Sequence, residues 1–272
     1  MTVEVLDHPE PGGPWRDEEP RRAALPVSMI ERMTLILDSF DAATPVLTLH
    51  GLVERTGLPR STVHRILDQM TRLRWLAHTP GGYRLGLRTL ELGGLAAGHN
   101  ELRTVVGPLL HELCLRTESV GHLGVLDGRD VLYLDKAGGR HSVTVPTRLG
   151  GRMPAHSTAL GKTLLAALDP GIVEKSLHEQ LPQLTPRTIG NRADLHRELT
   201  RIRKRQGVAV DNEESVTGIR CVAVPIRHRG VTVAAVSLST RVAVGGASED
   251  TARQARLLIP LANEAARLLN RR

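Results

Sequence analysis

The segment from residue 60 to residue 69 carries side chains that could bind a nucleic acid. Arginine and glutamine donate hydrogen bonds to base edges, and serine and threonine hydroxyls bind phosphate oxygens. Between residues 60 and 74, four arginines stand against one aspartate, so the segment is locally basic. Its apolar residues recur at helical spacing, which leaves the polar ones on the opposite face: Val63, Ile66, Leu67 and Met70. We assign DNA contacts to that polar face, with Arg65 at a base edge, and its members are Arg60, Ser61, Thr62, His64, Arg65 and Gln69.

A shorter helix must precede this one to position it. Leu49, Leu52 and Val53 fall on one helical face, and Gly57 stands where a helix ends in a left-handed residue. Pro59 is pre-set for the first turn of the following helix. The turn is therefore encoded locally, and the pattern predicts a helix-turn-helix whose second helix presents its N-terminal residues to the major groove. An ordinary solvated helix pair from an all-helical domain is the alternative.

Two short extended runs follow around the turn Pro80-Gly81-Gly82, which predicts a hairpin. A hairpin in this position is a wing, and a wing contacts the DNA backbone or the minor groove. We assign Tyr83 and Arg84 to DNA on this basis, and we add Thr48, before the first helix. The alternative for the two wing residues is ordinary hairpin surface.

The bulk composition narrows the class of protein. A chain of 272 residues fits two domains, and its net charge of +7 is spread along the sequence. Only 2% of the residues are aromatic, which disfavours a stacking platform for single strands and leaves duplex DNA as the better partner. Two cysteines and the absence of a secretory or membrane segment lead us to expect a cytoplasmic protein without disulfides. No histidine pair has metal-site spacing, so we expect no metal and no cofactor.

The hydrophobic patterns predict the following organisation. Residues 1–25 form a disordered tail, 26–86 a winged helix-turn-helix domain rich in α-helix, 87–100 a linker helix, and 101–272 a second domain. Ser28 is the predicted N-cap of a first helix that packs behind the turn pair. In the second domain, helices are predicted near 102–113, 158–168, 193–205 and 249–269, and strands at 120–126, 131–137, 143–145, 208–210, 219–226 and 231–238. This segregation indicates an α+β sheet domain.

Three segments give the chain a resemblance to the IclR family of bacterial transcriptional regulators. The first is the winged helix-turn-helix, with the run Gly57-Leu58-Pro59-Arg60-Ser61-Thr62-Val63-His64-Arg65. The second runs from Gly150 to Lys162. The third has Gly207, Asp211, Glu214, Cys221 and the run Val222-Ala223-Val224-Pro225-Ile226 at the family's spacing. The resemblance extends over nearly everything from Ser28 to Leu269.

The resemblance implies a C-terminal, GAF-like domain that binds a small organic acid or aromatic effector. Position by position, it implies one wall from Met153, Ala159 and Leu160, a second wall from Asp211, Ile219 and Cys221, and a sheet floor from Ser237 and Ser239. His156, Arg148 and Arg152 are weaker candidates for holding ligand charge. The family often has a small residue where this chain has Leu160, which predicts a narrower pocket.

The residues themselves are compatible with an anionic ligand. Ala159, Leu160 and Gly161 are expected at a helix N-terminus, whose unpaired amides attract carboxylates, and the two serines project from one strand face. Each has a structural alternative: the serines as satisfied core hydroxyls, Cys221 as a small buried hydrophobe, and Asp211 as a turn-fixing side chain.

The main hypothesis is therefore a ligand-responsive regulator that binds roughly palindromic double-stranded DNA as a dimer, or as a dimer of dimers, with no membrane partner. The family favours repression and does not exclude activation. An enzyme with Cys221 or Ser157 as nucleophile and His156 as base is a rival hypothesis, although Cys221 lies in an apolar strand pattern. A sensor or scaffold that uses the helix pair for protein contacts is a third.

Overall fold

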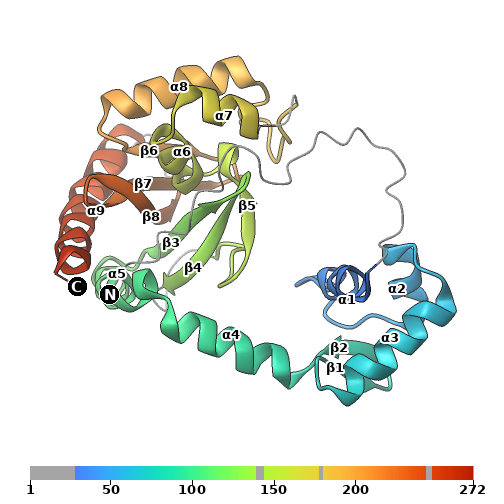
Figure 1. Cartoon of the computed structure of the whole chain (residues 1–272). Coiled ribbons are helices and arrows are strands. Elements are labelled where there is room, and N and C mark those ends of the chain that lie inside the picture. Colours follow the sequence, from blue (N-terminus) through green and yellow to red (C-terminus); the bar gives the residue numbers. More distant parts are fainter. Residues whose placement is uncertain (1–27, 139–143, 178–179, 243–246, 272) are drawn as a thin grey trace. The chain divides into compact units, whose positions relative to one another are not determined.

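The computed structural model describes residues 28–138, 144–177, 180–242 and 247–271 (Figure 1). The chain divides into two compact units between His99 and Asn100. The tail predicted for residues 1–25 and the first residue of the extended run at 143–145 lie outside the described residues.

The N-terminal unit is a helical domain with one hairpin. Ser28 caps α1 as the sequence predicts, because its hydroxyl accepts the Glu31 amide while the Glu31 carboxylate accepts the Ser28 amide. Leu47 exchanges backbone hydrogen bonds with Tyr83 and so adds an isolated bridge beside the hairpin. The elements are α1 (Met29–Asp38), α2 (Leu49–Thr56), α3 (Arg60–Arg72), β1 (Leu76–Thr79), β2 (Gly82–Leu85) and α4 (Leu87–His99).

The core of this unit lies between α1, α2, α3 and the hairpin. It is formed by nine buried side chains: Ile36, Leu47, Leu52, Leu58, Val63, Ile66, Leu67, Met70 and Leu76. The prediction that the first helix packs behind the turn pair is confirmed through Ile36 and the partly buried Met33 and Leu37. Met29 and Ile30 are 43% and 74% exposed, because the core begins only one turn further along α1.

The C-terminal unit is a six-stranded antiparallel sheet with helices on both faces. The strand order is β5-β4-β3-β8-β7-β6. The strands are β3 (Val120–Asp127), β4 (Asp130–Gly138), β5 (Arg152–Pro154), β6 (Ala209–Asn212), β7 (Ile219–His228) and β8 (Val231–Arg241). The helices are α5 (Glu101–Thr117), the 3-10 turn η1 (Ala155–Ser157), α6 (Ala159–Ala166), α7 (Pro170–Ser176), α8 (Arg192–Lys204) and α9 (Ala247–Asn270).

The sequence pattern missed β5, η1 and α7, and it was wrong at Thr144 and Val145, which lie outside any strand. β5 has only three residues, too few for a period-2 pattern to stand out. α7 begins with Pro170 behind the capping Asp169, a local start signal without a long apolar stripe behind it. All three elements lie next to α6 in the sequence.

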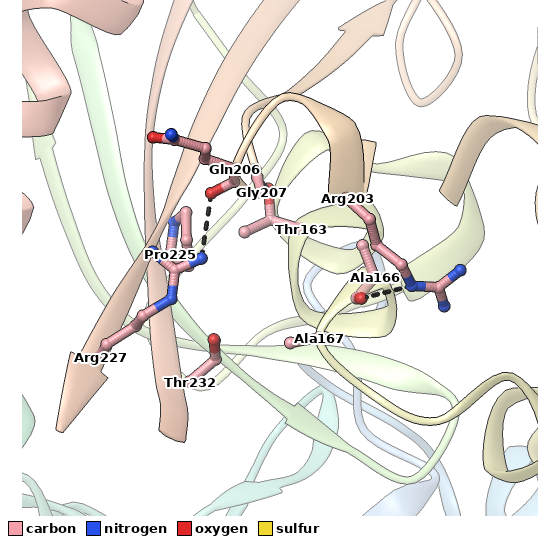
Figure 2. Close-up of a pocket in the computed structure, with 9 residues that line it drawn as sticks. All are labelled: Thr163, Ala166, Ala167, Arg203, Gln206, Gly207, Pro225, Arg227 and Thr232. Atoms are coloured by element: carbon pink, nitrogen blue, oxygen red, sulfur yellow. Dashed lines mark hydrogen bonds between the residues drawn. The ribbon is translucent and has the colours of Figure 1, made fainter. Parts of the chain in front are cut away.

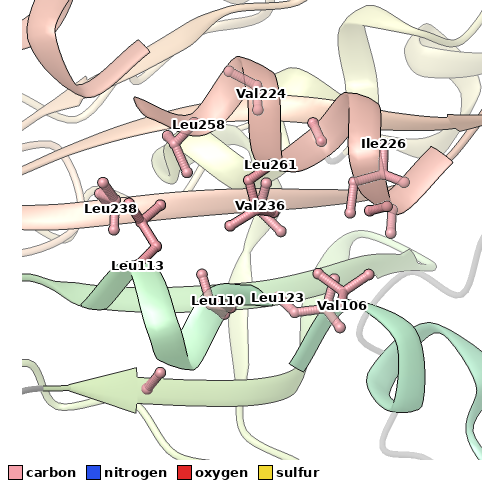
Figure 3. Packing of buried hydrophobic residues seen from close by; sticks show 14 of the residues in the cluster. Val106, Leu110, Leu113, Leu123, Val224, Ile226, Val236, Leu238, Leu258 and Leu261 are labelled. Atoms are coloured by element: carbon pink, nitrogen blue, oxygen red, sulfur yellow. The ribbon is translucent and has the colours of Figure 1, made fainter. Parts of the chain in front are cut away.

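The two faces of the sheet carry separate cores. Alternate strand residues such as Val224 and Val236 pack against α5 and α9, as Figure 3 shows. Their neighbours Ala223 and Ala235 point to the other face, toward α6 and α8. Small residues on this second face let α6 lie close to the strands, so the side chains of α6 are almost entirely buried.

Candidate DNA-binding surface and effector site

The turn between α2 and α3 has the conformation that the sequence predicts. Gly57 is the C-cap of α2 with φ 67°, and its amide donates to the Val53 carbonyl. Pro59 lies at the N-cap of α3, one position earlier than predicted, and its carbonyl accepts the Val63 amide. Leu58, between them, is buried in the core of the unit. The turn thus fixes the orientation of α3 relative to α2.

α3 separates an apolar face from a polar one. Five of the six residues assigned to DNA on this helix are exposed, and Thr62 is half-buried. Neither Arg60 nor Arg65 forms an ion pair with any carboxylate in the described part of the chain, whereas His64 lies 3.7 Å from Asp68. Two guanidinium groups are therefore available to an anion, and one of them, that of Arg60, lies in the first turn of α3, where the macrodipole is positive.

The three residues assigned to DNA outside α3 differ in their contacts. The Thr48 hydroxyl caps α2 by accepting the Gly51 amide at 3.1 Å. Tyr83 is half-buried, with its ring centroid 4.7 Å from that of His78. Arg84 is exposed on β2. Thr48 and Tyr83 thus have structural roles of their own, and Arg84 is the wing residue with the most accessible charge.

A buried ion pair joins the second and third family-like segments in the C-terminal unit. Lys162 on α6 is 1% exposed, and its Nζ lies 2.5 and 2.6 Å from the two carboxylate oxygens of Glu214. Burial raises the pKa of Glu214, while the charge of Lys162 opposes this shift. Sequence reasoning quoted both residues in the motifs but left them out of the assigned site. The signal that could have found them was a lysine in an otherwise apolar helix.

Asp211 lies beside this pair at the end of β6. Its carboxylate accepts the backbone amides of Glu214 and Ser215, at 2.6 and 3.3 Å, and the Ser215 hydroxyl. Burial raises its pKa, and the hydrogen bond from Ser215 is the largest opposing influence. The turn-fixing alternative for Asp211 is therefore confirmed. The same carboxylate lies within electrostatic reach of Lys162.

Three assigned residues share the face of the sheet that α6 covers. Ser239 pairs with Cys221 across β7 and β8, and their side-chain oxygen and sulfur are 3.0 Å apart. Ser237 pairs with Ala223 on one side and His122 on the other. The Ser237 hydroxyl has no hydrogen-bond partner among the described residues. Ser237 is therefore the assigned residue whose hydroxyl is most available to a ligand.

His122 adds a polar group that sequence reasoning missed. Its Nε2 lies 2.7 Å from the Thr147 hydroxyl, and its ring centroid is 5.2 Å from that of Tyr133. Burial lowers the pKa of His122 to about 3, with a smaller contribution from Lys136, so the ring is neutral near pH 7. His122 is recognised as a neighbour of the assigned site only because the sheet places it between Ser237 and Lys136. That position depends on strand order, which the sequence pattern does not show.

The remaining assigned residues are more widely spread. Met153 is on the edge strand β5, and β4, β3 and β8 separate it from Cys221 on β7. Ala159 and Leu160 begin α6, but both are buried in the core on that face. Leu160 reaches toward Gly124, where a Cβ would lie 3.3 Å from its Cδ1. Ile219 is buried at the start of β7.

The charged residues considered weaker candidates already have partners. Arg152 pairs with Asp127, and the Arg148 guanidinium reaches a backbone carbonyl at 3.4 Å. His156 bonds the Pro182 carbonyl at 2.9 Å, and burial lowers its pKa. The Ser157 hydroxyl donates to the Pro154 carbonyl instead of to His156. Burial also raises the pKa of the Cys221 thiol, so neither proposed nucleophile is activated.

A cavity of about 150 Å³ lies away from these residues, at the other end of α6 (Figure 2). None of the assigned effector residues lines it. Around the assigned residues themselves, the packing described above is close.

Comparison with known proteins decides the family. The model of the IclR C-terminal domain matches residues 95–267, and that of the IclR helix-turn-helix domain matches residues 29–80. This protein belongs to the IclR family. The resemblance drawn from the three motifs is confirmed, as is the two-domain architecture of a helix-turn-helix unit followed by an α+β unit.

Individual relatives agree with this assignment. The HTH-type transcriptional regulator XynR of Escherichia coli is 36% identical over 218 residues, which cover 79% of this chain and 86% of XynR. The transcriptional repressor IclR of the same species is 29% identical, with 82% and 85% covered. A Microbacterium hydrocarbonoxydans IclR homologue solved with 4-hydroxybenzoate superimposes with a TM-score of 0.79 at 29% identity, covering 90% of this chain and 100% of the homologue.

The chain is therefore a transcriptional regulator with a DNA-binding helix-turn-helix domain. None of the helices in the described ranges combines the length and apolar character that a membrane span requires. Within the same ranges, no three His, Cys, Asp or Glu side chains gather as a metal site would need.

Proposed function

We propose that this regulator represses transcription by placing the N-terminal turn of α3 in the major groove of its operator. The observation that carries the proposal is the exposed, cationic start of α3 behind the left-handed Gly57 turn, with Arg60 and Arg65 unpaired among the described carboxylates. Arg65 reads a base edge, and Arg60 binds phosphate at the helix N-terminus. Ser61, Thr62, His64 and Gln69 complete the surface, and Thr48, Tyr83 and Arg84 contact the backbone.

The test measures binding of the full-length protein to the intergenic DNA beside its own gene, by fluorescence anisotropy at two salt concentrations. Arg65→Ala should weaken specific binding by roughly ten- to a hundredfold while non-specific binding changes little. Arg72→Ala, at the far end of the same helix, is the matched control and should keep near-native affinity. Equal affinity of both variants for specific DNA would overturn the role of Arg65.

We assign the effector to the α6-facing side of the sheet. The proposed ligand class is a small aromatic or organic acid, supported by the 4-hydroxybenzoate in the Microbacterium homologue. Ser237 and Ser239 donate hydroxyl hydrogen bonds from the floor, with Asp211, Ile219 and Cys221 on one side and Met153, Ala159 and Leu160 on the other. Because Ala159 and Leu160 are packed in the core, entry of a ligand requires α6 to shift, and that shift is what a regulator can transmit.

Effector binding can be tested by adding 4-hydroxybenzoate and related acids to the protein–DNA complex. We expect one acid of this class to release the DNA. Ser237→Ala should raise the concentration needed by about tenfold, since it removes the hydroxyl donor without adding bulk. Thr240→Val is the matched control, because Thr240 lies on the same strand with its side chain on the other face, where Gln254 donates to it. Release of DNA from both variants at the native concentration would exclude Ser237.

A dimer is the proposed functional unit, and a dimer of dimers is its extension on DNA. Four leucines of α4 are exposed, and no residue of this helix is buried: Leu87, Leu90, Leu92 and Leu95. A helix whose apolar residues are all exposed in the single chain is typical of a helix that packs against a second copy of the protein. Leu90→Lys should produce monomers in sedimentation experiments, whereas Leu115→Lys, at an equally exposed leucine of α5, should not.

The protein acts, in this proposal, on DNA in the cytoplasm and catalyses no reaction. The raised pKa of the Cys221 thiol and the Ser157 hydroxyl bonded to a backbone carbonyl support the second statement. Slow reaction of Cys221 with a thiol reagent in the folded protein is expected, and fast reaction would reopen the enzyme hypothesis.

A further inference from the structure

The cavity at the C-terminal end of α6 is formed by four elements of the C-terminal unit. Figure 2 shows its lining side chains around a shared space below the α6 backbone. They come from α6 and the residue after it, from the end of α8 and the turn that follows it, and from the strands β7 and β8: Thr163, Ala166, Ala167, Arg203, Gln206, Gly207, Pro225, Arg227 and Thr232. Arg227 follows Cys221 by six residues along β7, about 20 Å at the rise of a strand. The cavity is thus separate from the assigned effector residues.

The wall of the cavity near Gly207 is held in place by short contacts. Gly207 has φ 93°, and a Cβ there would lie 2.8 Å from the Pro225 ring, so this position requires glycine. The Thr163 hydroxyl donates to the Gly207 carbonyl at 3.0 Å and anchors it to α6. A pocket whose walls are fixed before binding loses little free energy on ordering.

The lining offers one cationic group above a mostly apolar space. Arg227 is exposed, and one of its nitrogens donates to the Gln206 carbonyl at 3.0 Å. It pairs with no carboxylate in the described part of the chain. The Arg203 guanidinium, by contrast, already donates hydrogen bonds to the Ala166 and Leu168 carbonyls, at 2.9 and 3.3 Å. The Thr232 hydroxyl has no hydrogen-bond partner among the described residues.

We propose that this cavity is a second ligand site, which binds a small monocarboxylate with a compact apolar body. The volume of about 150 Å³ matches a cavity that holds a single benzene ring. The ring lies against Ala166, Ala167 and Pro225, while the carboxylate accepts hydrogen bonds from Arg227 at the mouth and from Thr232. A phosphate is disfavoured, because one guanidinium and an apolar wall leave most of its oxygens without donors.

Benzoate is the probe for this proposal, and the full-length protein is observed by amide NMR. We expect saturable shifts of the Gly207 and Thr232 signals. Arg227→Gln should weaken benzoate binding at these signals by roughly tenfold or more, because it removes a charge-assisted bond. Ala167→Leu fills the cavity from an exposed helix end and should also weaken binding. Arg229→Gln, an exposed arginine on the adjoining turn that does not line the cavity, is the matched control and should bind like the native protein.

Benzamide separates charge recognition from simple filling of the cavity. It has the same ring without the charge, so it should bind the native protein about tenfold more weakly than benzoate and should not distinguish Arg227→Gln from the native protein. Unchanged benzoate affinity in Arg227→Gln, equal affinity for the two ligands, or shifts confined to signals near Asp211 and Ser239 would each overturn the proposal. The experiment uses no DNA, so its failure leaves the proposed regulation untouched.

Discussion

In the N-terminal unit the residues assigned to DNA lie outside a small core, whereas in the C-terminal unit the residues assigned to the effector lie inside one. The polar face of α3 is continuous in the sequence and mostly exposed. Asp211, Cys221 and Ser239 come from three strands on the face that α6 covers; Asp211 and Ser239 are buried, and Cys221 is partly buried. Under the proposed function, the first surface can bind DNA without moving, whereas the second must rearrange to admit an effector.

This difference separates the consequences of substitution. A residue on the outer face of α3 can change without disturbing the core, so function and stability should vary independently there. Around α6, Asp211 is both an assigned effector residue and a buried carboxylate close to the buried Lys162–Glu214 pair. Substitutions there should affect stability first, and the following experiments are designed to break or sharpen that contrast.

The largest effect is expected from Lys162. Lys162→Ala leaves the Glu214 carboxylate buried without its cation, which should lower the free energy of unfolding by about 3–5 kcal/mol. Urea denaturation followed by circular dichroism measures the loss. The double variant Lys162→Met with Glu214→Leu removes both charges and should recover most of it. A single variant as stable as the native protein would show that the pair is not a stability element.

His122 should make the stability depend on pH. Its pKa is about 3 in the folded protein and near 6.5 when unfolded, so the unfolded chain takes up the proton first as the pH falls. The contribution of neutral, buried His122 is complete above pH 6.5 and declines below it, by about 2 kcal/mol between pH 7 and pH 5. Unfolding of His122→Gln and the native protein at both pH values isolates this contribution. Parallel pH profiles of the two proteins would contradict it.

Arg60 tests the exposed side of the contrast. Arg60→Ala should weaken binding to all DNA sequences by about tenfold and reduce the slope of log affinity against log salt by about 1, as expected for one lost phosphate contact. The free energy of unfolding should stay within about 0.5 kcal/mol of the native value. A loss of stability as large as the loss of binding would place Arg60 in the fold and not on the DNA surface.

The sequence predicted the N-terminal unit in more detail because its signals are local. Gly57 at a helix end, Ser28 at a helix start, and Pro80-Gly81-Gly82 between short extended runs each describe a structure within a few residues. The stripe of Val63, Ile66, Leu67 and Met70 then fixes which face of α3 is exposed. Periodicity alone does not show where a core ends, since Ile30 follows the helical pattern of α1 and is 74% exposed.

For the C-terminal unit, the sequence predicted the α+β fold class but only part of the site. The reason is that strand order depends on contacts between residues far apart in the sequence. The serines on β8 were correctly placed on one face, yet nothing in the spacing shows that β3 brings His122 beside Ser237. Met153 packs against the same core cluster as Ala159 and Leu160, with which it was grouped, whereas β4, β3 and β8 separate it from Cys221 in the other wall. Gly207 and Pro225 of the cavity belong to the third motif, yet nothing in the sequence joins them to Arg227 and Thr232, because the lining comes from several separate elements.

The smallest effect is expected at Gly94, and it has the opposite sign. A Cβ there would meet nothing within 4 Å, so Gly94→Ala should stabilise α4 by about 0.5–1 kcal/mol through lower backbone entropy in the unfolded chain. Gly161→Ala is the matched substitution in α6, where the added Cβ would collide with the Ala155 backbone and should destabilise the protein. Thermal unfolding of both variants measures the contrast. Destabilisation by Gly94→Ala would mean that α4 is closely covered in the functional assembly, so that even its glycine face is a packed surface.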